Sequence, residues 1–203
     1  MATIHRGATL TPHFRDFLPS WLARQPFYVG VGLPALAPVG FFRLEDPAGA
    51  VGIETHLLRD GETVYQLPMT YRDAPFLGAE HSLITTAEHS VLGTRWIYDG
   101  TADPVWIGRM LHLVRTEGVS EPSARPGVGD AAARGHLTGD ADVLTSDGAA
   151  IELIRTVTAR LVEPGPGILG LVTGRWYPAG PGSGAATGCL AVVRERRAPD
   201  SRQ

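Results

Sequence analysis

Residues 103–118, DPVWIGRMLHLVRTEG, indicate the fold class of this protein more clearly than any other stretch. Asp103 can accept hydrogen bonds from the amides at a helix start, and Pro104 suits the first turn because no hydrogen bond needs its missing amide there. Gly118 predicts the end of the helix. A broad apolar face lies between these signals, made by Trp106, Ile107, Met110, Leu111, Leu113 and Val114. A helix with so wide an apolar face has to lie on a sheet.

The chain before this helix predicts the strands of that sheet. Runs of strand character cover residues 37–45, 50–58, 62–71, 80–87 and 89–98. Turns as short as Asp60-Gly61 separate these runs, so neighbouring strands must pair antiparallel. A first amphipathic helix is expected over residues 11–24, starting at Pro12 and bent at Pro19.

The domain organisation is expected to have four parts. Residues 1–118 form an α+β domain, and residues 119–134, which have almost no large apolar side chains, form a flexible linker or loop. Residues 135–197 contain further strand-like runs that should complete the same fold. The sequence leaves open whether these strands join the first sheet or form a second one. Residues 198–203 are expected to be a disordered tail.

The chain contains no lysine, because all 18 basic residues are arginine, and asparagine is absent as well. Both missing residues have AT-rich codons, so this usage indicates a bacterium with a high-GC genome. The absence of lysine excludes the phosphate-binding lysine of a P-loop, the strand lysine of kinases and a Schiff base. No serine nucleophile motif occurs either, so an enzyme is the less favoured class.

Composition also limits the compartment and the partners. The single Cys189 excludes an internal disulfide and a cysteine-based zinc cluster, which suits the cytoplasm. A net charge of -3 with scattered arginines argues against a nucleic-acid partner. The longest uncharged run, residues 26–42, is broken by prolines and glycines, so no membrane span is expected.

The sequence Ala-Glu-His-Ser occurs twice, at residues 79–82 and 87–90. As metal ligands, His81 and His89 would have to converge with a third ligand. On one straight strand the two imidazoles would lie about 26 Å apart, so only a chain reversal between them could bring them together. We favour a structural histidine at a strand end and expect no metal and no cofactor.

Residues 88–111, EHSVLGTRWIYDGTADPVWIGRML, resemble the N-terminal cap domain of bacterial maltokinases and the small stand-alone proteins that share it. In this family a strand with an aromatic pair and an aspartate leads into a helix that begins with Asp-Pro. Residues 17–30, FLPSWLARQPFYVG, are similar to the first helix of the family and its Arg-Gln-Arg-Trp motif, although Pro26 and Phe27 replace the last two residues of that motif. The matching structural residues of the first stretch are His89, Gly93, Trp96, Tyr98, Asp99, Asp103 and Pro104.

The resemblance spans about residues 10–117, and it implies a cystatin-like cap in which curved antiparallel sheets pack on two amphipathic helices. In maltokinases the catalytic groups belong to the kinase portion, whose motifs are missing here. The resemblance therefore implies a stand-alone, non-catalytic module with a link to α-glucan, maltose or trehalose metabolism, and it transfers no catalytic, metal or cofactor-binding residue.

Three functional hypotheses stay open. The first is an accessory module that docks on a carbohydrate-metabolising enzyme or on itself, using the apolar segment 26–42 as contact surface. The second is a binder of a small sugar-like ligand in a cavity of the curved sheet. The third is an unrecognised enzyme that uses Glu54 and His56 as acid-base groups. The aromatic residues that could line the cavity, or an interface, are Tyr65, Tyr71, Trp96, Tyr98 and Trp176.

Overall fold

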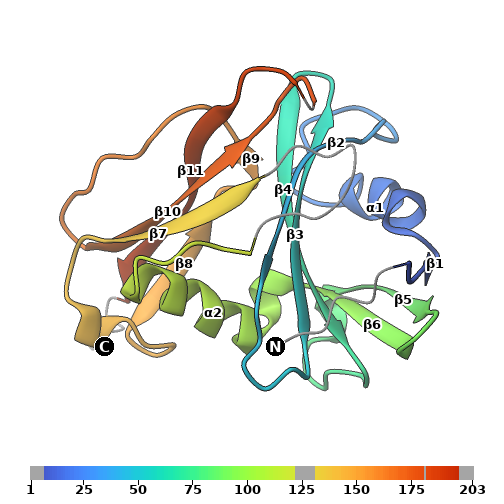
Figure 1. Ribbon diagram of the computed structural model, residues 1–203, viewed down its shortest axis with the longest axis horizontal. Helices are drawn as coiled ribbons and strands as arrows, with labels where there is room; N and C mark the ends of the chain where they lie inside the picture. The colour runs from blue at the N-terminus through green and yellow to red at the C-terminus, as the bar shows by residue number, and fades with distance from the viewer. Residues whose placement is uncertain (1–6, 122–130, 181, 197–203) are drawn as a thin grey trace, which may run out of the picture.

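The computed structural model describes residues 7–121, 131–180 and 182–196. Within these ranges the chain forms two α-helices and eleven strands, arranged in two antiparallel sheets (Figure 1). The predicted α+β class, with curved antiparallel sheets packed on two amphipathic helices, is confirmed. None of the described helices is long and apolar enough to cross a membrane.

The first sheet has the order β1-β5-β6-β4-β3-β2, and β9 pairs with β4 outside this path. The antiparallel pairing predicted from the short turns is present throughout. At residues 80–82, where a strand was expected, the chain forms the 3-10 helix η1 (Glu80–Ser82). The strands are β1 (Leu10–Thr11), β2 (Ala37–Leu44), β3 (Gly52–Asp60), β4 (Thr63–Arg72), β5 (Leu83–His89), β6 (Gly93–Asp99) and β9 (Thr156–Val157).

The second sheet answers the question that the sequence leaves open about the C-terminal strands. It has the order β7-β10-β11-β8, and of the C-terminal strands only β9 joins the first sheet. Two further 3-10 helices, η2 (Gly100–Ala102) and η3 (Ala141–Val143), lie in connections. The strands are β7 (Ala132–Leu137), β8 (Ala149–Leu153), β10 (Ile168–Trp176) and β11 (Ala186–Glu195).

Helix α2 (Pro104–Arg115) starts as its sequence predicts, because the side chain of Asp103 accepts a hydrogen bond from the Val105 amide at 2.9 Å. It ends three residues before Gly118. The amides of Glu117 and Gly118 donate back to the carbonyls of Val114 and Leu113, and Glu117 takes the left-handed conformation with φ 49°. This hydrogen-bond pattern satisfies the last carbonyls of the helix.

Helix α1 (Phe14–Leu22) begins later than predicted. Leu10 and Thr11 pair with β5 as strand β1, so they are not part of the helix. His13 caps the helix instead: its Nδ1 accepts from the Arg15 amide, and its own amide donates to the carboxylate of Asp16 at 2.9 Å. Tertiary pairing with β5 thus overrides the start signal of Pro12.

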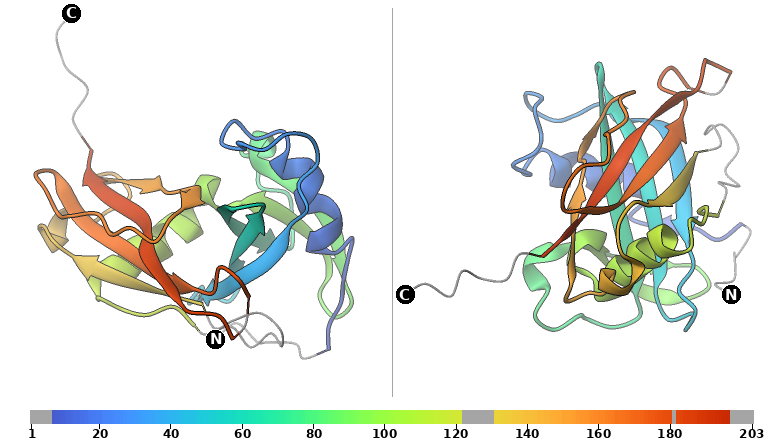
Figure 2. Two further views of the ribbon diagram at one scale, coloured as in Figure 1. Left: turned by 90° about the horizontal axis from the view of Figure 1, so that it is seen from above. Right: turned by 90° about the vertical axis from the view of Figure 1, so that its left-hand side faces the viewer.

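The helices lie on opposite sides of the first sheet (Figures 1 and 2). Helix α1 packs Leu18 and Leu22 against Leu58, Leu67 and other residues of one face. The other face, helix α2 and the second sheet enclose a larger core that contains Trp106, Val114 and Trp176. Each helix therefore has its own hydrophobic core, as its apolar stripe requires.

Backbone hydrogen bonds tie the two sheets together on both sides of the larger core. On one side, Glu121 exchanges backbone hydrogen bonds with Arg43 of β2, and the Ser120 amide donates to the Ala133 carbonyl. On the other side, the Ile154 amide donates to the Leu190 carbonyl, and the Gln66 amide donates to the Arg155 carbonyl. The sheets thus close around the core. The predicted linker, 119–134, is paired at both described ends, and residues 122–130 lie outside the described residues.

Candidate functional site

One polar cluster lies on the α1 side of the first sheet and contains Glu54, His56 and Tyr71. The sequence offers Glu54 and His56 as acid-base groups. The Tyr71 hydroxyl donates to Oε2 of Glu54 at 3.0 Å, and Nε2 of His56 lies 3.4 Å from the same oxygen. The imidazole of His56 packs between the rings of Phe14 and Phe41, with centroids 4.6 and 4.9 Å away, and the residue is 2% exposed. A substrate could reach this imidazole only by displacing the two phenyl rings.

The two Glu-His sequences occupy different environments. His89 ends β5, and its Nδ1 accepts hydrogen bonds from the amides of Val91 and Leu92 in the turn to β6. His81 lies exposed in η1. Among the residues that the structure describes, no three histidine, cysteine or carboxylate side chains are grouped so that they could hold a metal ion.

The Asp-Pro start of α2 is tied to the first sheet by an ion pair. Asp103 is fully buried, and its two oxygens accept hydrogen bonds from Nε and Nη2 of Arg72, each at 2.8 Å. Burial alone would raise the pKa of Asp103, but the hydrogen bonds from Arg72 and from the Val105 amide outweigh it and hold the pKa below its usual value. Phe76 covers the guanidinium of Arg72, whose carbon lies 4.4 Å from the ring centroid. Pro104 occupies the first turn of the helix.

A second ion pair links this segment to the C-terminal part of the chain. Asp99, at the end of β6, accepts hydrogen bonds from the amide and hydroxyl of Thr101 and from Nη2 of Arg155, the last at 2.5 Å. The guanidinium carbon of Arg155 lies 4.6 Å from the ring centroid of Phe27. Sequence reasoning missed Arg155, since a single arginine in a strand-like run carries no signal for its distant partners.

The structure does not bring the five candidate aromatic residues together. Tyr65 and Tyr71 face α1, whereas Tyr98 pairs with Thr70 and faces the opposite side of the sheet, as does Trp96 opposite Arg72. Trp176 belongs to the core between the sheets. Gly93, with φ 72°, supplies the left-handed residue of the turn between β5 and β6.

Only the first part of the apolar segment 26–42 forms a loop, which lies beside α1 (Figure 1). Residues 37–42 belong to β2, where Val39, Phe41 and Phe42 are buried, so this part is not contact surface.

We call residues 28–35 the apolar loop. Asp60, the last residue of β3, holds both ends, because one oxygen accepts the Tyr28 hydroxyl and the other accepts the Ala35 amide, both at 3.0 Å. Between these anchors, Val29, Val31 and Leu33 are 68%, 99% and 68% exposed.

A groove with a volume of about 400 Å³ lies between the end of the apolar loop and α1. Its lining is apolar except for one arginine on α1. The exposed tip of the loop and this groove are adjacent in the chain, since Leu33 is followed directly by Pro34 of the lining. The lining residues are Phe14, Arg15, Pro19, Pro34, Ala35, Leu36 and Leu58.

Comparisons with known proteins give one family and no curated relative. A search of curated proteins found no match. Residues 21–103 match the model of the maltokinase N-terminal cap domain. The match runs from Trp21 in α1 to Asp103 at the start of α2, so it contains the apolar loop and both aspartates of the ion pairs. Over these residues the chain is similar to the maltokinase N-terminal cap domain, the family that its sequence resembles.

Proposed function

We propose that this protein is a non-catalytic accessory module that docks, through the apolar loop, on a carbohydrate-metabolising enzyme. The family of residues 21–103 supports a link to α-glucan, maltose or trehalose metabolism. The reducing cytoplasm suits a chain with one cysteine. The observation that carries the proposal is the exposure of Val29, Val31 and Leu33 on a loop held at both ends.

Two properties of the apolar loop favour its use as a binding surface. Single apolar residues on a surface are common, but three on one short loop form a patch typical of an interaction site. Burying a valine or leucine side chain contributes about 1.5–3 kcal/mol relative to its exposed state. The two hydrogen bonds to Asp60 restrict the loop before a partner arrives, which lowers the entropy cost of binding.

The alternative of a sugar-like ligand is less well supported. It depended on aromatic rings gathered in one cavity, and the rings of Tyr65 and Tyr98 instead lie on opposite faces of the first sheet. An enzyme based on Glu54 and His56 is also less well supported, because the imidazole is buried behind phenyl rings.

The test is a binding experiment with purified enzymes of α-glucan, maltose and trehalose metabolism from the same organism. The full chain is immobilised, and each enzyme is passed over it in turn. We expect one enzyme to bind and the double variant Val31→Asp, Leu33→Asp to lose at least tenfold in affinity, since charges replace the apolar contacts.

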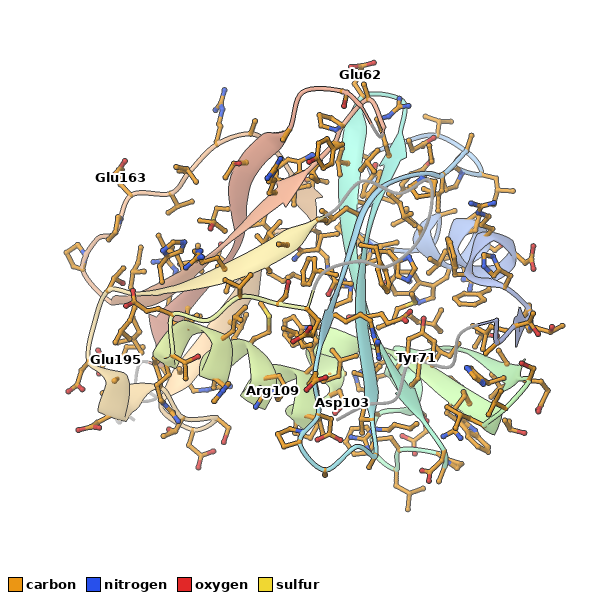
Figure 3. All side chains as sticks on the ribbon, in the orientation of Figure 1. Glu62, Tyr71, Asp103, Arg109, Glu163 and Glu195 are labelled. Carbon is orange, nitrogen blue, oxygen red and sulfur yellow. The ribbon has the colours of Figure 1, made fainter. Side chains whose placement is uncertain are left out.

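The matched control is Leu161→Asp, which changes an aliphatic residue that is 62% exposed in a distant loop. This loop also contains Glu163, which Figure 3 shows on the side of the molecule away from α1. The control should bind like wild type. Failure of every enzyme to bind, or full binding by the loop variant, would reject the proposal.

A further inference from the structure

We infer that the groove beside α1 is an anchor site for an aliphatic side chain followed by a carboxylate, as in a Leu-Glu segment of the docking partner. The inference rests on the proposed function, because the groove and the apolar loop form one surface. It adds the chemistry of the residue that the partner inserts.

The shape and lining of the groove account for the aliphatic part. Its volume of about 400 Å³ lies within the range of roughly 300–1,000 Å³ in which proteins hold ligands. Leu58 and Phe14 are almost fully buried, at 1% and 7%, and provide a firm apolar floor. Pro19 and Pro34 line opposite walls, one on α1 and one on the apolar loop. An aliphatic side chain that inserts here would leave water and contact these apolar surfaces, which is favourable.

The charges around the groove account for the carboxylate. Arg15 is the only charged residue of the lining, and its side chain is exposed on α1. Arg24, exposed just beyond the end of α1, is not part of the lining. Neither arginine forms an ion pair with a carboxylate of the described residues.

The nearby carboxylates are already occupied by the backbone. Asp16 accepts the His13 amide as part of the helix cap, and Asp60 holds the two ends of the apolar loop. Neither carboxylate pairs with Arg15, so an acidic group supplied by a partner can pair with it, while the charges of Asp16 and Asp60 reduce the attraction. The same hydrogen bonds fix both walls of the groove, so the site is formed before binding.

The experiment titrates the 15N-labelled full chain with three acetylated, amidated dipeptides and follows amide signals by NMR. Ac-Leu-Glu-NH2 carries both features, Ac-Leu-Gln-NH2 lacks the charge, and Ac-Ala-Glu-NH2 lacks the anchor. We expect Leu-Glu to give saturable shifts at Arg15, Ala35, Leu36 and Leu58. Leu-Gln should bind about two- to fivefold more weakly, the size of a solvent-exposed ion pair, and Ala-Glu should not saturate.

Substitutions at the two arginines test the source of the charge preference. Arg15→Gln should bind Leu-Glu and Leu-Gln equally, whereas Arg15→Lys should keep the preference. Arg24→Gln, the control on the same helix, should bind like wild type. Unchanged thermal midpoints in these variants would show that folding is intact, which is expected because both side chains are exposed.

Three results would overturn the inference. The first is equal affinity of the wild-type protein for Leu-Glu and Leu-Gln, and the second is an Arg15→Gln variant that still prefers Leu-Glu. The third is a concentration-dependent shift of the groove signals without peptide, which would place a second copy of the chain in the groove. The titration uses no partner enzyme. A failed titration therefore leaves the loop-dependent docking of the proposed function intact. A failed enzyme-binding experiment likewise leaves the result of the peptide titration unchanged.

Discussion

The two sides of the first sheet use their apolar surface in different ways. On the α2 side the helix, the second sheet and the sheet face bury one another, and the buried Asp103 is paired with Arg72. On the α1 side a short helix covers part of the face, and the apolar loop leaves Val31 almost fully exposed. Folding thus buries the large side chains between the two sheets, whereas on the α1 side it leaves Val29, Val31 and Leu33 exposed on one loop. Surface that folding does not use is available for a partner.

The comparison predicts that the largest loss of stability will come from the ion pair on the α2 side. In Asp103→Ala the guanidinium of Arg72 loses its partner and the first turn of α2 loses its cap. The expected loss is about 3–5 kcal/mol in the free energy of unfolding, measured by urea denaturation.

The control for this prediction is Glu152→Ala, which breaks the exposed pair with Arg194. It should cost less than about 1 kcal/mol, because solvent screens a surface pair. Equal losses in the two variants would show that the α2 side depends no more on its ion pair than the surface does.

The second prediction concerns the close packing of α2 on the second sheet. A Cβ added at Gly135 of β7 would overlap the carbonyl of Leu113 in α2, so Gly135→Ala should cost about 1–3 kcal/mol. Gly108 lies within α2 with no atom near its Cβ position. Gly108→Ala should therefore stabilise the protein, by up to about 1 kcal/mol, because alanine favours a helix. Calorimetry should give midpoint shifts of opposite sign, and a shared sign would contradict the packing argument.

The smallest effect is expected on the α1 side. Val31→Asp should change the free energy of unfolding by no more than about 0.5 kcal/mol, because the side chain makes no contact that folding needs. Leu111→Asp, at a buried position of α2, is the matched substitution and should prevent stable folding. Urea denaturation measures the first variant, and far-UV circular dichroism shows whether the second folds. A loss above 1 kcal/mol for Val31→Asp would mean that the apolar loop serves folding.

Much of the fold follows from local signals in the sequence. The cap at Asp103 and the apolar face of residues 105–114 predict α2, and short turns predict antiparallel pairs. The uncharged run 26–42 offers contact surface as one hypothesis, and its residues 28–35 are the apolar loop. These features depend on neighbours within a few residues, so the sequence displays them directly.

The candidate site was predicted less completely, because its key contacts join distant residues. Asp60 closes the apolar loop from the end of β3, 25 to 32 positions away, and Arg155 reaches Asp99 across 56 positions. A carboxylate or a guanidinium on a strand can pair with many partners, and only the fold selects one. The hypothesis that the five aromatic residues line a cavity or an interface had the same weakness, since alternation along a strand does not show which faces of different strands meet.

By itself, the sequence determined the helix and strand types and the antiparallel pairing, since each depends on short-range patterns of polarity, caps and turns. Only the tertiary structure decided that the C-terminal strands form a second sheet, that β1 replaces the expected start of α1, and that the apolar loop stands exposed beside a groove. The physical reason is that these features depend on the free energies of burying whole sheet and helix faces and of pairing distant strands. Those free energies belong to the assembled chain and not to any segment of it.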